Sequence, residues 1–233
     1  MIDIHCHILP GIDDGSKDFE ESIKMAFFAA EEGVRTIVAT PHVDDDSLNS
    51  ETINDLTMAL NHKLKVLSIP IEIIPGAEIS YVLPEEFIKN YTINNNGYVL
   101  IEFPHSHLPA GAVEKLLAIT SHGMKPIIAH PERNPSVIKN PGLLSDLAAE
   151  TGAAVQVTAA SIAGDFGRRI QMCSHHLLKK GIVDLIASDA HSMRFRPPSM
   201  NRGLRAAGRL IGRKHVEKLT IENPKAVING LSF

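Results

Sequence analysis

Short hydrophobic runs alternate along this chain with longer amphipathic segments. The runs predict strands at residues 1–5, 36–39, 71–75, 98–103, 126–129, 154–157 and 184–187. Helical patterns cover residues 19–32, 51–67, 84–89, 111–122, 142–150, 168–180, 200–211 and 224–229. The first helix has Asp18 and Glu21 at capping-box spacing and Gly33 just past its end. Seven strands alternating with helices predict an α/β fold with a parallel sheet, in the form of a TIM-like barrel.

The composition is that of an ordinary globular chain, and it narrows the class of partners. The 233 residues are 44% hydrophobic and 21% charged, without a low-complexity tract or internal repeat. We therefore expect one domain over residues 1–233, which is near the ~250 residues of a TIM-type barrel. The formal net charge of −4 argues against nucleic-acid binding, because a chain that neutralises many phosphates carries a basic excess.

The two cysteines and the first residues of the chain indicate the cellular compartment of the protein. Cys6 and Cys173 form no CxxC or disulfide-framework pattern, which favours a reducing compartment. A candidate ligand at His5 leaves no room for a removable signal peptide, and no run reaches the ~18 apolar residues of a membrane span. The sequence predicts a cytoplasmic protein with no membrane span.

Histidine and acidic residues lie at or just after the ends of six of the seven runs, where barrel enzymes carry their chemistry. His5 and His7 are two apart in an extended segment, so both face one side and can bind one ion or two adjacent ions. Only the sixth run brings no such residue. With a residue from the first loop, the candidate ligands are His5, His7, Asp14, His42, Glu78, Glu102, His130, Asp189 and His191.

This set is too large for a single ion. One tetrahedral zinc uses about four ligands, so five imidazoles and four carboxylates imply two or three ions. Mixed imidazole and carboxylate ligands suit Mn, Fe or Zn, and no thiolate is needed because Cys6 alternates to the opposite face. An isolated H-x-H pair is a weak signal, but the further matched positions make coincidence a poor explanation. The remaining helical histidines are expected to be solvated.

Four segments carry a resemblance to a known family. They are residues 4–15 (IHCHILPGIDDG), residues 130–133 (HPER), residues 188–191 (SDAH) and residues 196–198 (RPP). Over its whole length the chain resembles the PHP (polymerase and histidinol phosphatase) superfamily. Within it, the chain is most similar to the manganese-dependent bacterial protein-tyrosine phosphatases of capsule and exopolysaccharide operons.

The resemblance implies a distorted seven-stranded (β/α) barrel whose trinuclear centre is ligated by the nine candidates. It also implies that Arg133 and Arg196 bind the phosphate, which suits an anion site in an acidic protein. The implied cofactor is Mn²⁺, two or three ions per chain, with Fe or Zn as alternatives. The implied substrate and partner is the phosphotyrosine cluster on the tail of a bacterial tyrosine kinase that controls polysaccharide export. Arg194 departs from the family pattern, and its role is left open.

Phosphate release at such a centre needs no cysteine. Water bound to the ions would lose a proton near neutral pH and attack phosphorus in line, while ions and arginines offset the charge on the oxygens. Cysteine-based tyrosine phosphatases have an arginine six residues after the nucleophile. Those positions after Cys6 and Cys173 hold Ile12 and Lys179, so cysteine-based catalysis is rejected.

The general acid is not assigned from sequence. Asp13, Glu132 and His105 are placed as candidates. His105 and His107 follow the fourth run, and for both the choice between substrate contact and an ordinary loop role stays open.

Other functions are compatible with the same residues. A histidinol-phosphate phosphatase or an exonuclease-like PHP domain would share the metals. An amidohydrolase is less favoured, because it would place a carboxylated lysine where this chain has Glu102. A non-catalytic, metal-stabilised module that binds a kinase is the alternative of another class, and the complete ligand set with both arginines argues against it.

Overall fold

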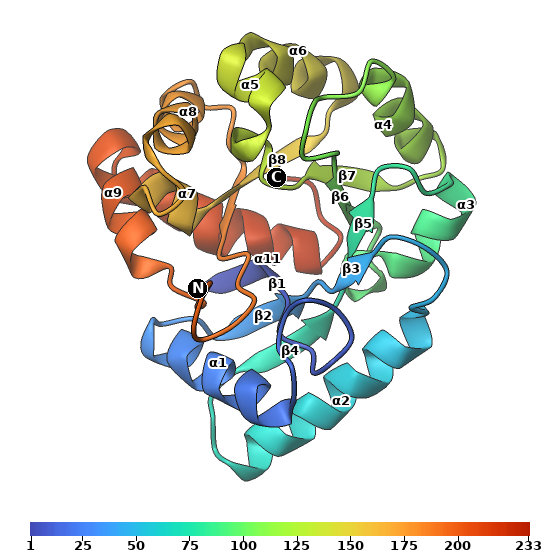
Figure 1. Cartoon of the computed structure of the whole chain (residues 1–233), viewed down its shortest axis with the longest axis vertical. Helices are drawn as coiled ribbons and strands as arrows, with labels where there is room; N and C mark the ends of the chain where they lie inside the picture. Colours follow the sequence, from blue (N-terminus) through green and yellow to red (C-terminus); the bar gives the residue numbers. More distant parts are fainter.

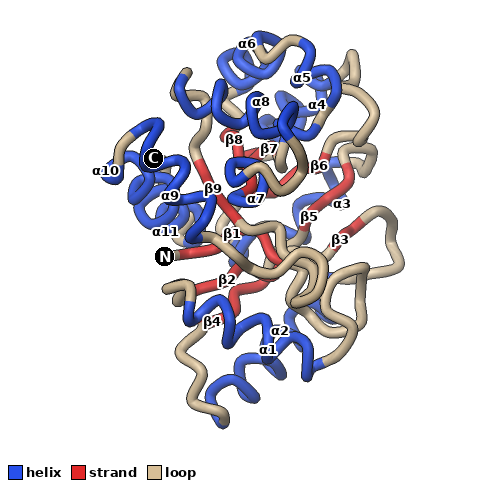
Figure 2. The backbone as a smooth tube through the Cα atoms, turned by 60° about the vertical axis from the view of Figure 1, so that its left-hand side comes forward, coloured by secondary structure: helices blue, strands red, loops and turns tan.

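Strands occupy the middle of the molecule and helices lie around them (Figures 1 and 2). The computed structural model describes every residue from 1 to 233. Its strands are β1 (Ile2–Cys6), β2 (Thr36–Ala39), β3 (His42–Val43), β4 (Glu72–Pro75), β5 (Glu78–Ser80), β6 (Tyr98–Glu102), β7 (Lys125–Ile128), β8 (Ala154–Thr158) and β9 (Leu185–Ala187).

The helices differ widely in length. The longer ones are α1 (Phe19–Glu31), α2 (Ser50–Val66), α4 (Ala112–Ser121), α6 (Gly142–Thr151), α8 (Arg168–Lys179) and α9 (Asn201–Ile211). The shorter ones are α3 (Glu85–Ile88), α5 (Pro135–Lys139), α7 (Ala159–Ala163), α10 (Arg213–Glu217) and α11 (Asn223–Ile228). Three 3₁₀ turns, η1 (Lys89–Tyr91), η2 (Ile93–Asn95) and η3 (Pro131–Arg133), and the π-helical η4 (Lys218–Glu222) complete the chain.

All paired strands are parallel, in the orders β1-β2-β4 and β3-β5-β6-β7-β8-β9. The two sheets run into each other, because β3 follows β2, and β5 follows β4, after two residues in each case. Backbone bonds also join β1 to the segment after β9: His7 N donates to Ala190 O at 2.8 Å, and Asp189 N donates to His5 O at 2.8 Å. The molecule is therefore an α/β fold with a curled parallel sheet.

The seven predicted strands are all present, with each end within one residue of its predicted place. His42 and Glu78 follow β2 and β4 as predicted, but they also begin the short strands β3 and β5, which were not predicted. Segments of two and three residues are too short to show a period of two. The helices α5, α7 and α10 were also missed. Each has five residues, which is too short to show the helical period of 3.6 residues.

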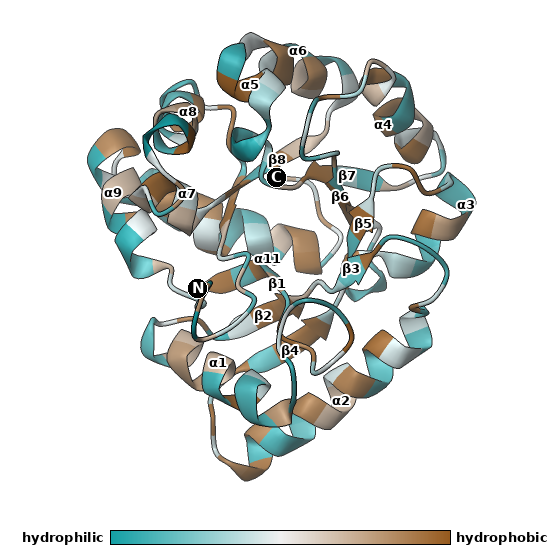
Figure 3. Cartoon of the chain, in the orientation of Figure 1, coloured by the Kyte–Doolittle hydropathy of each residue, from teal (hydrophilic) through white to brown (hydrophobic).

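Apolar side chains lie on both faces of the strands, as expected for a sheet buried on both sides. On β6, Val99 and Ile101 belong to a cluster of 47 buried residues that includes the helices, whereas Leu100 belongs to a separate cluster of 12. The smaller cluster lies on the concave face, where α11 contributes Val227. Figure 3 shows brown stretches on strands such as β2, inside helices that carry both brown and teal stretches.

The start of α1 follows the predicted cap in part. The Asp18 carboxylate accepts a hydrogen bond from Glu21 N at 2.9 Å, which satisfies a free donor of the first turn. The Glu21 carboxylate does not return this bond and accepts from Met193 N at 3.1 Å instead. This contact ties α1 to the loop that follows His191. No helix in the structure combines the length and the apolar character needed to cross a membrane.

Candidate metal centre

The fold brings all nine predicted ligands together at the carboxyl ends of the strands. Possible ligand atoms lie within 4.8 Å of one another in three overlapping groups: His5, His7, Glu78 and Asp189; His7, Asp14, His42 and His191; and His42, Glu78 and Glu102. The ninth residue, His130, joins them through its Nε2, which lies 2.8 Å from Glu78 Oε1. The residues come from segments 5–14, 42, 78–102, 130 and 189–191, so only the folded chain unites them.

The innermost group is buried and its donor atoms converge. Nε2 of His5 and Nε2 of His7 are 3.2 Å apart, and Glu78 Oε2 lies 3.2 Å from each of them. Asp189 Oδ1 lies 3.4 Å from the same two nitrogens. Neither Glu78 Oε2 nor Asp189 Oδ1 has a hydrogen-bond partner, although both are buried. Buried oxygens without partners, facing two imidazole nitrogens, fit a divalent cation.

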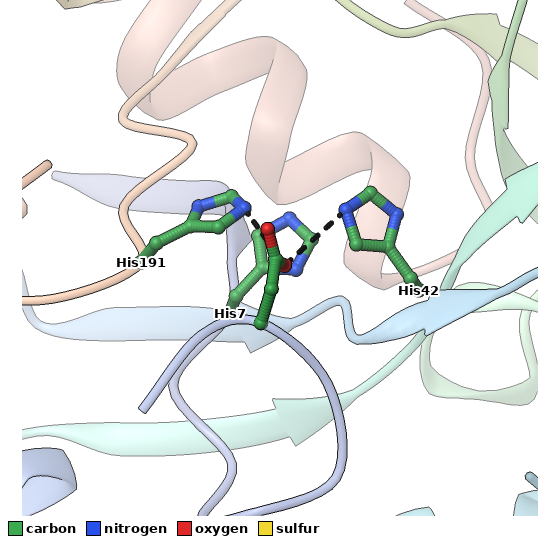
Figure 4. A group of neighbouring side chains, drawn as sticks. His7, His42 and His191 are labelled. Carbon is green, nitrogen blue, oxygen red and sulfur yellow. Dashed lines mark ion pairs between the residues drawn. The ribbon is translucent and has the colours of Figure 1, made fainter. Parts of the chain in front are cut away.

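The second group lies nearer the surface. Figure 4 shows the imidazoles of His7, His42 and His191 gathered around one carboxylate. Asp14 Oδ1 lies 3.3 Å from His191 Nε2 and 3.6 Å from His42 Nε2. The Asp14 side chain is 66% exposed, whereas that of His191 is 7% exposed. This group therefore opens toward solvent, where a substrate can reach it.

The third group lies on the other side of His42. His42 Nδ1 is 3.3 Å from Glu78 Oε2 and 3.7 Å from Glu102 Oε2. Glu102 Oε1 lies 3.6 Å from His130 Nε2. Burial and the negative charge of Glu78 raise the pKa of Glu102 to about 8. A bound cation would favour the ionised carboxylate at this position.

Charges in the centre balance one another despite burial. Burial opposes the charged form of His7, but its hydrogen bond with Asp13 and the nearby carboxylates of Asp189 and Glu78 raise its pKa well above the ordinary value. Burial also opposes ionisation of Asp189, yet neighbouring positive charges, His5 first, hold its pKa well below the ordinary value. Burial and the charge of His7 lower the pKa of His191 to about 3. Cations that bind here would replace protons on imidazoles as partners of the carboxylates.

Asp13 orients His7 and is therefore not available as a general acid. Its Oδ2 lies 2.7 Å from His7 Nδ1 and accepts from His42 N at 3.1 Å, while its Oδ1 accepts from Gly15 N at 3.0 Å. Burial alone would raise its pKa, but the hydrogen bond and charge of His7 lower it. A histidine that donates from Nδ1 to a carboxylate presents Nε2 to a metal.

Two of the predicted ligands have a strained backbone. His130 has φ 30° and Asp189 has φ 52°, in the left-handed region that residues other than glycine rarely adopt. Asp3 supports the second of these turns, because it accepts from Ser188 N at 2.9 Å and from Ser188 Oγ at 2.5 Å. Such strain persists where the surrounding structure enforces it and is concentrated at functional sites.

The two predicted phosphate-binding arginines meet on one atom at the edge of the centre. Arg133 Nη2 lies 2.5 Å and Arg196 Nη2 lies 2.7 Å from Asp189 Oδ2. Arg133 also donates to Thr158 Oγ1 at 3.1 Å, and its guanidinium lies 4.4 Å from the centre of the Phe166 ring. Thr158 and Phe166 were not singled out by the sequence analysis, since neither residue type has a spacing signature at such a site.

The sequence left the roles of Arg194, His105 and His107 open, and of these three only His105 lies at the entrance of the centre, here called the mouth. Arg194 is exposed, forms no ion pair and stacks on its neighbour Phe195 at 4.9 Å. His105 is 80% exposed, with Nε2 3.5 Å from Glu102 Oε1 at the mouth, whereas His107 contacts Ser106. The mouth itself is an acidic cavity of about 570 Å³.

The remaining acid candidate and both cysteines are buried. Glu132 is fully buried. Its Oε1 accepts from Thr158 N and Oγ1 at 3.0 and 3.1 Å and so holds the end of β8, while its Oε2 has no hydrogen-bond partner. Cys6 and Cys173 are free thiols. Burial raises the pKa of Cys173 to about 12 and that of Cys6 well above its ordinary value. Neither thiol is activated as a nucleophile.

A curled parallel sheet with an imidazole and carboxylate cluster at its carboxyl edge defines the class of TIM-like α/β proteins with a candidate metal centre. Solved structures support the fold: an organophosphorus hydrolase matches with a TM-score of 0.61 and 12% identity, over 97% of this chain and 92% of its own. A histidinol phosphate phosphatase from Lactococcus lactis matches with a TM-score of 0.57 and 13% identity, over 94% of each chain.

The chain belongs to the CpsB/CapC family of capsular polysaccharide synthesis, whose model matches residues 1–229. It is 40% identical over 202 residues to the tyrosine-protein phosphatase YwqE of Bacillus subtilis, covering 84% of this chain and 79% of YwqE. It is 30% identical over 239 residues to the tyrosine-protein phosphatase CpsB of Streptococcus pneumoniae, covering 98% of both chains.

A crystal structure from a study of these same two proteins, described there as metal-dependent tyrosine phosphatases, matches with a TM-score of 0.93. Its sequence identity is 35%, and the match covers 100% of this chain and 96% of that chain. The resemblance found in the sequence motifs is therefore confirmed at the level of the family.

Proposed function

We propose that this protein is a metal-dependent phosphomonoester hydrolase that removes phosphate from phosphotyrosine on a protein. The observation that carries the proposal is the position of Arg133 and Arg196, which meet at Asp189 beside the cluster of predicted ligands. Divalent ions next to two guanidinium groups form a site for a tetrahedral dianion. Membership of a family whose relatives are named tyrosine-protein phosphatases supports phosphotyrosine as the substrate.

We also propose that the curled sheet is a seven-stranded barrel. If β2 with β3 and β4 with β5 are each counted as one interrupted strand, seven strand positions remain, and β1 lies beside β9. This count supports a distorted (β/α)₇ barrel of the PHP type that forms one domain over residues 1–233.

We assign two or three Mn²⁺ ions per chain to the nine residues of the centre. Their convergence and the buried oxygens without partners support this assignment. The ligands are His5, His7, Asp14, His42, Glu78, Glu102, His130, Asp189 and His191. Imidazole and carboxylate ligands also accept Fe or Zn, so the test below compares the metals.

When bound, the ions supply an activated water and neutralise phosphate charge. The chain's own contribution is the pair Arg133 and Arg196, which bind phosphoryl oxygens and offset their charge as the bond to the phenol oxygen breaks. A phenol has a pKa of ~10, so this leaving group depends less on protonation than the alkoxide of a serine ester. That difference agrees with the absence of a general acid at Asp13 and Glu132, whose carboxyl groups are engaged in hydrogen bonds.

The proposed partner is a bacterial tyrosine kinase of capsule or exopolysaccharide synthesis, whose phosphorylated tail enters the mouth of the barrel. The family's role in capsular polysaccharide synthesis supports this partner. The two free, buried cysteines suit a reducing compartment, and we place the protein in the cytoplasm on that basis.

The test is phosphate release by chelator-treated protein, with and without added Mn²⁺, Fe²⁺ or Zn²⁺. The substrates are matched phosphotyrosine and phosphoserine peptides and histidinol phosphate. Release that returns with Mn²⁺ and is confined to phosphotyrosine is expected. Preference for histidinol phosphate would assign the protein to the biosynthetic phosphatases, and release from no substrate under any metal would favour a metal-stabilised binding module.

A further inference from the structure

A groove of about 730 Å³ lies between α5 and α8, outside the metal centre. Its apolar part includes Ile138 and Pro141 on one side and Met172 on the other, with the buried Cys173 between them. Met172 is 61% exposed. Nothing within the chain covers this long apolar side chain.

The groove is lined by basic side chains. They are Lys139, Arg169 and His176, and no carboxylate lines the groove. Lys139 and Arg169 are exposed and take part in none of the ion pairs of the lysines and arginines. Unpaired cations around an exposed apolar floor are complementary to a peptide segment that carries both acidic and apolar side chains.

Both walls of the groove adjoin η3, the segment that carries Arg133. Its α5 wall begins two residues after Arg133, and Asn134 fixes that start by accepting from Ser136 N at 2.9 Å and donating to Pro104 O at 3.0 Å. Its α8 wall begins two residues after Phe166, whose ring contacts the Arg133 guanidinium. Figure 1 shows α5 and α8 as neighbours on the same side of the molecule. A chain whose phosphate lies at Arg133 is therefore within reach of the groove.

We propose that this groove binds the segment of the protein substrate that flanks its phosphotyrosine, and selects acidic and apolar residues there. This inference rests on the proposed function, because it takes the phosphate to bind at Arg133. The acidic mouth on the other flank of the centre, with Asp44 and Asp45 in its wall, disfavours the same segment. Because one flank of the centre is basic and the other is acidic, the bound peptide has one preferred chain direction.

The experiment compares three phosphotyrosine peptides whose flanking residues are glutamate with leucine, glutamine with leucine, or lysine with leucine, placed on one side of the phosphotyrosine only. One set of three carries them on the N-terminal side and a second set on the C-terminal side. The enzyme variants are the double substitution Lys139→Glu and Arg169→Glu, and Met172→Asp. Arg205→Glu serves as the matched control, because Arg205 is an exposed arginine on α9 outside the groove. Hydrolysis of p-nitrophenyl phosphate, which has no flanking residues, reports the integrity of the metal centre.

The expected result is a KM that rises from the glutamate to the glutamine to the lysine peptide in the set whose flanking residues enter the groove. The double substitution should raise KM for the glutamate peptide about tenfold, as two exposed charge pairs allow, and reverse the order of the peptides. Met172→Asp should raise KM for the glutamate and glutamine peptides, because it removes the apolar floor and adds a negative charge. None of the variants should change p-nitrophenyl phosphate turnover, and the control should change nothing.

Equal KM values for the three peptides, or variants without effect on them, would overturn the groove while the proposed function stands. Conversion of a wild-type dimer to monomers by Met172→Asp, with unchanged peptide KM, would instead show that a second copy of the chain occupies the groove. Release of phosphate from p-nitrophenyl phosphate but from none of the peptides would overturn both proposals.

Discussion

Gln156 Oε1 lies 3.0 Å from His5 Nδ1, so a residue of β8 orients a predicted ligand on β1. The same oxygen lies 3.3 Å from the backbone N of His130. A backbone N–H can only donate, which identifies this Gln156 atom as the oxygen of the amide. His5 Nδ1 therefore carries a proton, and Nε2 is the nitrogen left to bind a metal ion once it has lost its own proton.

Replacing this acceptor should weaken metal binding. We expect Gln156→Leu to lower the affinity for Mn²⁺ by about ten- to hundredfold, because the His5 tautomer and ring orientation are no longer fixed. Calorimetric titration of the chelator-treated protein measures this change without reference to activity. Gln156→Glu keeps an acceptor oxygen and serves as the control. Equal affinities of the leucine variant and the wild type would show that Gln156 does not support the site.

Metal binding should release protons. The pKa of Glu102 is raised to about 8 by burial and by the charge of Glu78, so in ion-free protein at pH 7 this carboxyl is mostly protonated. A proton there competes with an ion, and the apparent Mn²⁺ affinity should increase as the pH rises toward 8 and level off above it. His7, whose pKa is also raised, acts in the same direction.

Titrations in two buffers of different ionisation enthalpy count the released protons. In Glu102→Gln the count at pH 7 should fall by about one, because this group no longer titrates. An unchanged count would mean that Glu102 is already ionised before the metal binds.

The convergence of the nine candidate residues could be predicted from sequence because of two regularities. The alternation of side chains places His5 and His7 on one face, and the carboxyl ends of parallel strands meet at one edge, so residues as distant as His42 and Asp189 converge. These rules need only a strand and a position, and the structure brings all nine residues together.

The supporting residues could not be predicted in the same way. Gln156 lies on the one strand that brings no predicted ligand, and a lone amide has no spacing that marks it as a partner of His5. Asp13 was a candidate for the general acid, and nothing in the sequence around it indicates its contact with His7. The groove between α5 and α8 involves a helix of five residues, too short for a hydrophobic period to be recognised.

Gly15 should be required for the loop that carries Asp14. A Cβ at this position would lie 2.3 Å from the carbonyl oxygen and 2.5 Å from the Cβ of His7. Gly15→Ala must displace the loop from β1, and we expect a loss of about 1–3 kcal/mol in the free energy of unfolding together with weaker metal binding.

Gly208→Ala is the matched control for this substitution. Gly208 lies within α9, and no heavy atom other than Arg213 Cγ, at 4.0 Å, is near an added Cβ. Alanine should stabilise that helix by about 1 kcal/mol. Chemical denaturation of both variants measures the two effects, and a Gly15→Ala protein as stable as the wild type would contradict the close approach to His7.

Catalysis should not depend on cysteine. Burial raises the pKa of Cys173 to about 12 and that of Cys6 well above its ordinary value, so neither thiolate is populated near neutral pH. The double variant Cys6→Ala and Cys173→Ala should keep phosphotyrosine hydrolysis within about threefold of the wild type, and iodoacetamide at pH 8 should not inactivate the native enzyme. A complete loss of turnover with metal content intact would contradict a mechanism without a nucleophilic thiol.

Arg133 and Arg196 should contribute through guanidinium geometry as well as charge. Both already contact Asp189 Oδ2, and a lysine at either position keeps the charge but loses the planar fork that binds two oxygens. We expect Arg133→Lys and Arg196→Lys each to lower kcat/KM for a phosphotyrosine peptide about a hundredfold, as for the loss of one charge-stabilising donor. Competitive inhibition by inorganic phosphate should weaken in parallel, whereas the bound metal, measured by emission spectroscopy, should stay the same.

Arg194→Lys is the control, because Arg194 is exposed, forms no ion pair and stacks on Phe195. Equal losses in all three variants would indicate a general electrostatic effect of the loop rather than direct phosphate binding by the two arginines at Asp189.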